Sequence, residues 1–142
     1  MRRRAREYAV QILYALDLNP APVKEFLQMF WELNPCKPEI TEYASSLVTG
    51  TLEKKREIDA LISAHSSHWK IDRMAVTDRN ILRLATYELI EERSVPSRVV
   101  INEAIEIAKK FGTTDSAIFI NGVLDSIHQE LVASQKSSQH AS

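Results

Sequence analysis

The chain of 142 residues has little of what most secreted proteins and nucleotide-binding enzymes depend on. It contains three glycines and one cysteine, and 7% of its residues are aromatic. So few glycines argue against a glycine-rich sandwich or barrel and against a nucleotide-binding α/β fold. The single cysteine, Cys36, can form neither an internal disulfide nor a thiolate metal cage, so we expect a reducing, cytoplasmic compartment.

Membrane and catalytic signals are also missing from the sequence. No apolar run approaches the roughly 20 residues that cross a bilayer, and no apolar stretch follows the basic start to make a signal peptide. The chain has no phosphate-binding glycine loop and no G-x-S-x-G nucleophile elbow. Two short motifs, His65 with His68 and Asp125 with His128, have metal-site spacing but lack the further ligands that such sites need. We therefore expect no catalytic residue, no metal and no cofactor.

What the chain does have is helical periodicity along nearly its whole length. Apolar residues recur at spacings of three and four, with no convincing strand, which predicts an all-α fold. Gly50 lies inside a helical pattern, so close packing or a bend is expected there. Helix caps are expected at Thr77 or Asp78, at Ser97, and at Thr113, Thr114 or Asp115. The expected helices lie at about 3–18, 22–34, 39–65, 77–92, 97–111 and 113–133.

A polar break at about residues 66–71 divides the helices into two groups. We expect one helical domain over residues 1–133, made of two packed three-helix-type subdomains at about 1–66 and 67–133. The helix at about 77–92 is apolar nearly all round, so it is expected at the centre of the second half. The polar tail, residues 134–142, is rich in serine and glutamine and is predicted to be disordered.

The charge distribution is more informative than the net charge of −1. The first six positions contain four arginines: Arg2, Arg3, Arg4 and Arg6. The rest of the chain has 14 basic and 19 acidic residues. Helical geometry fans these arginines around the helix start, with only Glu7 close enough in sequence to neutralise them. Cations there oppose the helix dipole, and the arginine fork suits phosphate, which favours an RNA or DNA partner. An ordinary solvated basic terminus is the alternative.

Two helix faces point away from the expected core. Val10 and Tyr14 lie opposite the core stripe of the first helix, which indicates either a partner surface or packing against another helix. In the last helix, Asp115 and Phe119 are one turn apart beside Ile118. Phe119 is suited either to stacking on a base or to closing the edge of the core. The pattern alone leaves both pairs of alternatives open.

Four stretches in register carry a family likeness. They are RRRARE running into AVQILY (2–14), DRNILRLATYEL (78–89), VP followed by INEAIEIAKKFG (95–112) and FINGVLD (119–125). Together these stretches resemble the NusB family of bacterial transcription antitermination factors. The resemblance implies a NusB-like helical bundle of two packed subdomains without enzymatic activity. It also implies binding of boxA-type RNA from ribosomal RNA operons together with NusE, a small-subunit ribosomal protein, in the RNA polymerase antitermination complex.

The resemblance also implies which residues make the contacts. Tyr14 and Asp78 map to the NusE surface, although Asp78 is, from its position alone, simply a helix cap. Relatives commonly carry a basic residue where this chain has Ile118. This departure removes a phosphate contact, adds apolar exposure and leaves a homodimer open in the absence of NusE. The RNA-binding residues implied by the likeness are Arg2, Arg3, Arg4, Arg6, Asp115 and Phe119.

Three other functions are alternatives to this interpretation. The chain is also compatible with an accessory RNA-binding domain of the kind found on ribosomal RNA methyltransferases, or with a nonspecific basic RNA binder. A helical DNA-binding regulator would need a polar recognition helix, and the expected helices after residue 77 are too apolar for that role.

Overall fold

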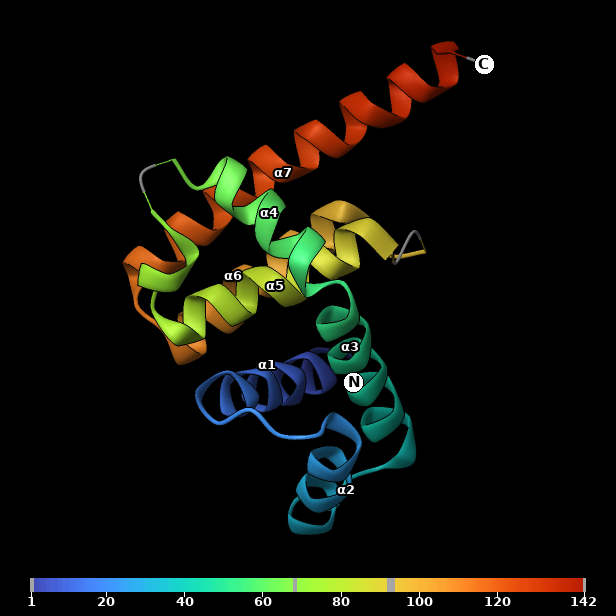
Figure 1. The fold of residues 1–142 in the computed structure, drawn as a ribbon, viewed down its shortest axis with the longest axis vertical. Helices are drawn as coiled ribbons and strands as arrows, with labels where there is room; N and C mark the ends of the chain where they lie inside the picture. The colour runs from blue at the N-terminus through green and yellow to red at the C-terminus, as the bar shows by residue number, and fades with distance from the viewer. Residues whose placement is uncertain (1, 68, 92–93, 142) are drawn as a thin grey trace.

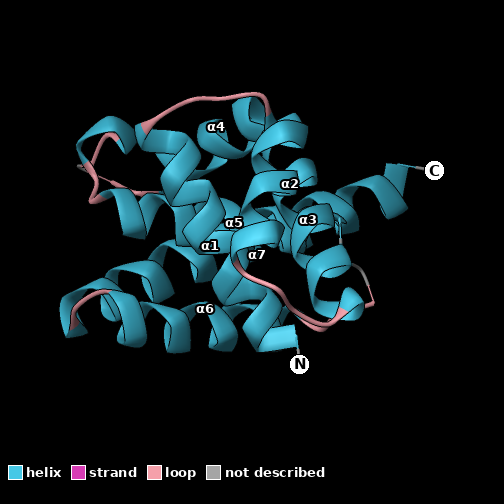
Figure 2. Ribbon diagram, turned by 90° about the horizontal axis from the view of Figure 1, so that it is seen from below, coloured by secondary structure: helices cyan, strands magenta, loops and turns pink. Residues whose placement is uncertain are grey.

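The computed structural model describes residues 2–67, 69–91 and 94–141, and this part of the chain is helical without any strand (Figure 2). The predicted all-α fold is therefore confirmed. No helix in the described ranges is long and apolar enough to cross a membrane. The elements are α1 (Arg2–Leu18), α2 (Val23–Leu33), α3 (Pro38–Glu53), α4 (Lys55–His65), the 3-10 turn η1 (Ile71–Arg73), α5 (Val76–Glu91), α6 (Ser97–Phe111) and α7 (Thr114–Ala141).

Helix α5 lies at the centre of the whole bundle, whereas its all-round apolar pattern predicted a central place only in the second half of the chain. Residues 80–86 are all buried, and α1, α3, α4, α6 and α7 each pack against this helix. Helix α1 also packs on α3, while α6 and α7 pack side by side (Figure 1). A smaller apolar cluster of Ala5, Ile40 and Ala44 joins α1 to α3.

The main hydrophobic cluster includes residues from α1, α3 and α4 together with residues from α5, α6 and α7. The two predicted groups of helices thus share one core, and the predicted subdomain boundary near residue 66 stays a prediction. Figure 1 shows α2 at the lower edge of the molecule, where it covers α1 and α3. Its side chains are at most half-buried, and its apolar face packs against the edge of the main hydrophobic cluster through Val23, Phe26, Leu27, Phe30 and Trp31.

The expected helix over residues 39–65 is instead two helices that meet at Lys54. The predicted close packing at Gly50 is confirmed, because a methyl group there would overlap the ring of Tyr87 from α5. The chain turns four residues later, where the Lys54 amide donates to the carbonyls of Gly50 and Leu52. This turn lets α4 place Ile58 and Ile62 fully in the core.

The predicted caps are confirmed in only one of three places. At the start of α7, the amide of Ser116 donates to Thr113 Oγ1 at 3.1 Å and Thr113 N donates to Ser116 Oγ at 3.3 Å, a reciprocal capping arrangement. Helix α5 begins two residues before Asp78, so Asp78 lies in its first turn and is not the cap. Ser97 does not cap α6, because Pro96 holds the cap position and the Ser97 hydroxyl lies 3.3 Å from His128 Nε2.

The tail that the sequence predicts to be disordered is helical in the structure, because α7 continues to Ala141. Its C-terminal part projects from the body of the bundle (Figure 1). No glycine or proline follows Gly122 in the sequence, so nothing interrupts the helix. Because each added residue extends a helix at little cost once a nucleus exists, a polar segment can continue a well-packed helix.

Substituting Gly50 with alanine should lower the free energy of unfolding by about 1–3 kcal/mol, because the new methyl group displaces the Tyr87 ring from a packed position. Gly122→Ala is the matched control: nothing lies within 4 Å of its added methyl group, so it should stabilise α7 by up to about 1 kcal/mol. Denaturant unfolding of both variants measures the difference. Equal effects of the two substitutions would show that Gly50 is not a packing position.

Candidate nucleic-acid interface

Buried and half-buried ion pairs hold α1 against α5 at both ends. Near the start of α1, Arg6 donates to both carboxylate oxygens of Glu88 at 2.7 and 2.9 Å, and both side chains are buried. Near its end, Asp17 accepts from Arg79 at 2.7 and 2.9 Å and from Arg83 at 3.0 Å. The pairing of early with late positions shows that the two helices run antiparallel.

The pKa of Asp17 reflects this setting. Burial by itself raises the pKa, but hydrogen bonds from Arg79 and Asn80 and the charges of Arg83 and Arg79 outweigh it and lower the pKa to about 2. Arg83 also donates to both oxygens of Asp59 at 2.8 and 3.2 Å, which connects α4 to the same cluster. The end of α1 is therefore fixed by an ionised network that includes α4 and α5.

Arg6 was expected among the exposed arginines at the start of the helix, but it is buried. Its guanidinium lies inside the bundle and is occupied by Glu88, a residue 82 positions away in the sequence. Arg3 is also neutralised by a residue distant in the sequence, because it pairs with Glu103 of α6, whereas Glu7, the acidic residue nearest in sequence, pairs with Lys110. A helical wheel of α1 shows only local neighbours, so neither acidic partner was visible in it.

The other three arginines are exposed on the first turn of α1. The Arg2 guanidinium lies over the ring of Tyr43 at 5.0 Å, and that of Arg4 lies over the ring of Tyr8 at 5.5 Å. Such cation–π contacts hold the side chains in place while their charge stays accessible to solvent.

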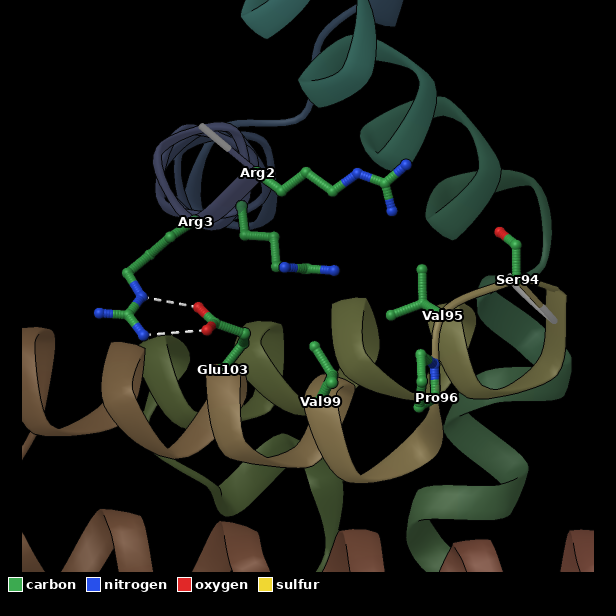
Figure 3. Close-up of a pocket in the computed structure, with 8 residues that line it drawn as sticks. Arg2, Arg3, Ser94, Val95, Pro96, Val99 and Glu103 are labelled. Atoms are coloured by element: carbon green, nitrogen blue, oxygen red, sulfur yellow. Dashed lines mark hydrogen bonds and ion pairs between the residues drawn. The ribbon is translucent and has the colours of Figure 1, made fainter.

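A pocket of about 620 Å³ lies between the start of α1 and the start of α6. Figure 3 shows Arg2 extending from α1 across the top of it, while Arg3 extends to one side and meets Glu103 of α6. Val95, Pro96 and Val99 form its apolar wall on the α6 side. The site therefore combines guanidinium groups with an apolar floor, which suits a chain that carries both phosphates and bases.

Lys110 extends this cationic surface along α1, and sequence reasoning missed it. Its ammonium lies 2.5 Å from a carboxylate oxygen of Glu7. A second pocket of about 220 Å³, next to the first turn of α1, is lined by Arg4, Glu7, Tyr8, Gln11 and Lys110. In the sequence, the two lysines of the KKFG run only offset the negative end of the α6 helix dipole. The packing of α6 along α1 is what places Lys110 on this surface.

Tyr14 and Asp78, the residues predicted to bind a protein partner, lie at the other end of α1. Tyr14 is 40% exposed, whereas Val10, predicted on the same outward face, is buried. Packing therefore accounts for Val10 and leaves Tyr14 at the surface. Tyr14 lies one turn before Asp17, and Asp17 binds Arg79, the neighbour of Asp78.

The structure brings Asp78, Asp115 and Phe119 together around one pocket of about 380 Å³, which Trp69 and Arg73 also line. Asp78 accepts a hydrogen bond from the Ser116 hydroxyl at 3.1 Å. Burial raises the pKa of the Asp78 carboxyl, and this hydrogen bond opposes the change only in part.

Packing places Phe119 at the edge of the core, and base stacking by the same ring stays a prediction. Its ring is half-buried against the main hydrophobic cluster and also lines this pocket. Ile118 is 68% exposed, as expected for an apolar residue at the surface of this helix.

The two candidate metal motifs have ordinary partners in the structure. His65 Nδ1 lies 2.6 Å from Ser126 Oγ, while His68 lies outside the described residues. Asp125 accepts from Gln129, and His128 contacts Ser97. Within the described ranges, no group of three or more His, Cys, Asp or Glu side chains is placed to hold a metal ion.

Comparison with known proteins decides the family. The NusB family model matches residues 3–129, which is most of the chain. The chain belongs to the NusB family. It is 44% identical over 138 residues to the transcription antitermination protein NusB of Desulfatibacillum aliphaticivorans, covering 97% of this chain and 96% of that protein.

Solved structures of NusB proteins show the same fold. NusB of T. maritima superposes with a TM-score of 0.82 at 39% identity, covering 92% of each chain. A crystal structure of the antitermination factors NusB and NusE in complex with dsRNA contains a chain with a TM-score of 0.82 at 33% identity, covering 91% of this chain and 96% of that chain. The NusB-like helical bundle is thus confirmed for this protein.

Replacing Glu88 with glutamine should lower the free energy of unfolding by about 3 kcal/mol or more, because it leaves the buried Arg6 charge without a counter-charge. Glu103→Gln is the matched control, since it removes the same charge from a partly exposed ion pair and should cost about 1 kcal/mol or less. Urea unfolding at neutral pH compares the two variants. A Glu88→Gln protein as stable as the control would show that the buried pair does not hold α1 in place.

Proposed function

We propose that this protein is an RNA-binding antitermination factor that contacts boxA-type RNA through the first turn of α1. The observation that carries the proposal is the clustering of exposed Arg2, Arg3 and Arg4 on one helical turn, with Lys110 beside Arg4, on a protein whose net charge is −1. The NusB–NusE–dsRNA structure of a relative supports an RNA partner for this fold.

The chemistry of the surface suits phosphodiester groups. Arginine forks make two parallel hydrogen bonds to phosphate oxygens, and each neutralised phosphate releases counterions into solution. Tyr43 and Tyr8 keep Arg2 and Arg4 ordered before RNA arrives. Less conformational entropy is then lost on binding. Arg6 is proposed as a support for this helix, because its own donors are directed to Glu88.

We also propose that a NusE-type protein binds at the opposite end of α1, on the surface that carries Tyr14 and Asp78. An exposed tyrosine near the end of α1 and a half-buried carboxylate near the start of α5, which packs antiparallel to α1, are groups that protein–protein contacts commonly use. This end is separate from the arginine pocket, so the RNA segment bound by the arginines and the protein partner would contact different ends of the same helix.

Asp115 and Phe119 stay proposed as RNA contacts, through a base. A carboxylate repels phosphate but accepts hydrogen bonds from the amino group of a base, and a phenylalanine ring offers a stacking surface. Both residues line the pocket that Asp78 also lines, which would place this RNA segment beside the protein partner.

Participation in the RNA polymerase antitermination complex, and a function without catalysis, follow from the same proposal. The accessory-domain alternative gains no support from the comparisons, since the NusB of Desulfatibacillum aliphaticivorans matches over 96% of its own length. A homodimer through the face that includes Ile118 remains a proposal for the protein without its partner.

Changing Arg2 and Arg4 together to alanine should weaken binding of boxA-type RNA by about tenfold or more and reduce the salt slope by about 1.4, because two phosphate contacts to single-stranded RNA are lost. Fluorescence anisotropy over a range of salt concentrations measures both quantities. The matched control is Lys55→Ala with Arg56→Ala, which removes two exposed cations from α4 instead.

An unchanged salt slope in the Arg2/Arg4 variant would contradict the assignment of these residues. A scrambled RNA of the same length provides the specificity test. Equal affinity of the unaltered protein for both RNAs would reduce its function to nonspecific basic binding.

Tyr14→Asp should abolish co-purification with NusE while the helical circular dichroism is retained, because a charge is placed on a partner surface that is already exposed. Met29→Asp is the matched control, since it places the same charge at an exposed apolar position on α2. Loss of helical signal in Tyr14→Asp would assign Tyr14 to the core. Retained NusE binding would place the partner elsewhere.

A further inference from the structure

Arg3 differs from its two exposed neighbours because its donors are already occupied by a carboxylate. Its Nε and one terminal nitrogen donate to the two oxygens of Glu103 at 2.7 and 2.9 Å. Arg2 and Arg4, in contrast, lie over tyrosine rings. Figure 3 shows the Arg3–Glu103 pair at one side of the pocket between α1 and α6. The two oxygens of Glu103 therefore occupy the positions that two phosphate oxygens would take.

The pair is placed so that it can open. The Arg3 side chain is 56% exposed and that of Glu103 is 18% exposed, so water and ions reach the guanidinium directly. Exposed ion pairs of this kind contribute little stability, so exchange of one anion for another is inexpensive. The adjoining pocket of about 620 Å³ gives the freed arginine and an incoming phosphate room to meet.

Glu103 is an effective competitor at neutral pH. The hydrogen bonds from Arg3 lower the pKa of its carboxyl below the ordinary value, although burial opposes this change. Glu103 extends from α6, a different helix from the one that carries the arginines, so its position is fixed by the packing of the bundle.

We propose that Glu103 sets the affinity of this surface for RNA by competing with a phosphodiester group for the fork of Arg3. The inference rests on the proposed RNA-binding function and adds a residue that opposes it. In the free protein Arg3 pairs with Glu103, and in the RNA complex Arg3 pairs with phosphate. The carboxylate that is released then faces the solvent-filled pocket.

The test uses Glu103→Gln, which keeps the shape of the side chain but removes its charge. It should bind boxA-type RNA about fivefold more tightly, the factor that corresponds to the upper range for an exposed ion pair. If Arg3 then engages phosphate more fully, the salt slope should steepen, by up to about 0.7 for one phosphate on a single strand. In an Arg3→Ala background the same substitution should change RNA affinity by less than about twofold, because only screened, longer-range repulsion is then relieved.

Glu106→Gln is the matched charge control. Glu106 lies one turn further along α6 and is 3.5 Å from Lys109, so its removal changes the net charge equally without freeing Arg3. We expect this variant to change RNA affinity by less than about twofold, since only screened, longer-range repulsion is relieved.

Two results would overturn the inference while leaving the proposed function intact. In the first, RNA binds the unaltered protein but Glu103→Gln binds it no more tightly. In the second, the Glu103 and Glu106 variants tighten binding equally, which would show that only net charge matters. Failure of the unaltered protein to bind any RNA is a separate outcome, and it would overturn the proposed function itself.

Discussion

The antiparallel attachment of α1 to α5 is the constraint on which the rest of the surface depends. Arg6 and Glu88 hold one end of α1, and the cluster around Asp17 holds the other. Because breaking a buried ion pair leaves a charge uncompensated, these contacts strongly disfavour any other rotation of the helix. The rotation of α1 about its axis in turn determines which of its arginines face solvent. It also places Tyr14 at the surface. The buried contacts of α1 therefore determine which of its side chains form the proposed interface.

Much of the fold could be predicted because it depends on local patterns. The all-α class, the central position of α5 in the second half of the chain and the close packing at Gly50 follow from periodicity and composition. The turn at Lys54 could not be predicted, since it results from α4 reaching across to bury Ile58 and Ile62 against α5. The helical end of α7 was missed for a different reason: composition describes an isolated segment, whereas a helix that is already nucleated continues through it.

The candidate site shows the same division between local and long-range information. Charge density at the start of α1 predicted a surface of Arg2, Arg3, Arg4 and Arg6, of which Arg6 is buried. The acidic partners of Arg3 and Arg6 lie 100 and 82 residues away in the sequence. Family likeness supplied Asp78, whereas its place in a pocket with Asp115 and Phe119 comes from the meeting of the starts of α5 and α7. Ion pairs and pockets between helices depend on how the helices pack, and the periodicity of the sequence does not predict them.

Because Arg6 faces the interior, the charge that the RRRAR stretch presents to solvent is smaller than its sequence suggests. Four guanidinium groups give the start of this helix a formal charge of +4, yet Glu88 and Glu103 each neutralise one of them. Before any ligand arrives, an approaching polyanion therefore meets an effective charge close to half of the formal one. For an arginine-rich helix that belongs to a folded domain, the electrostatic attraction depends on how many guanidinium groups the interior has left uncompensated.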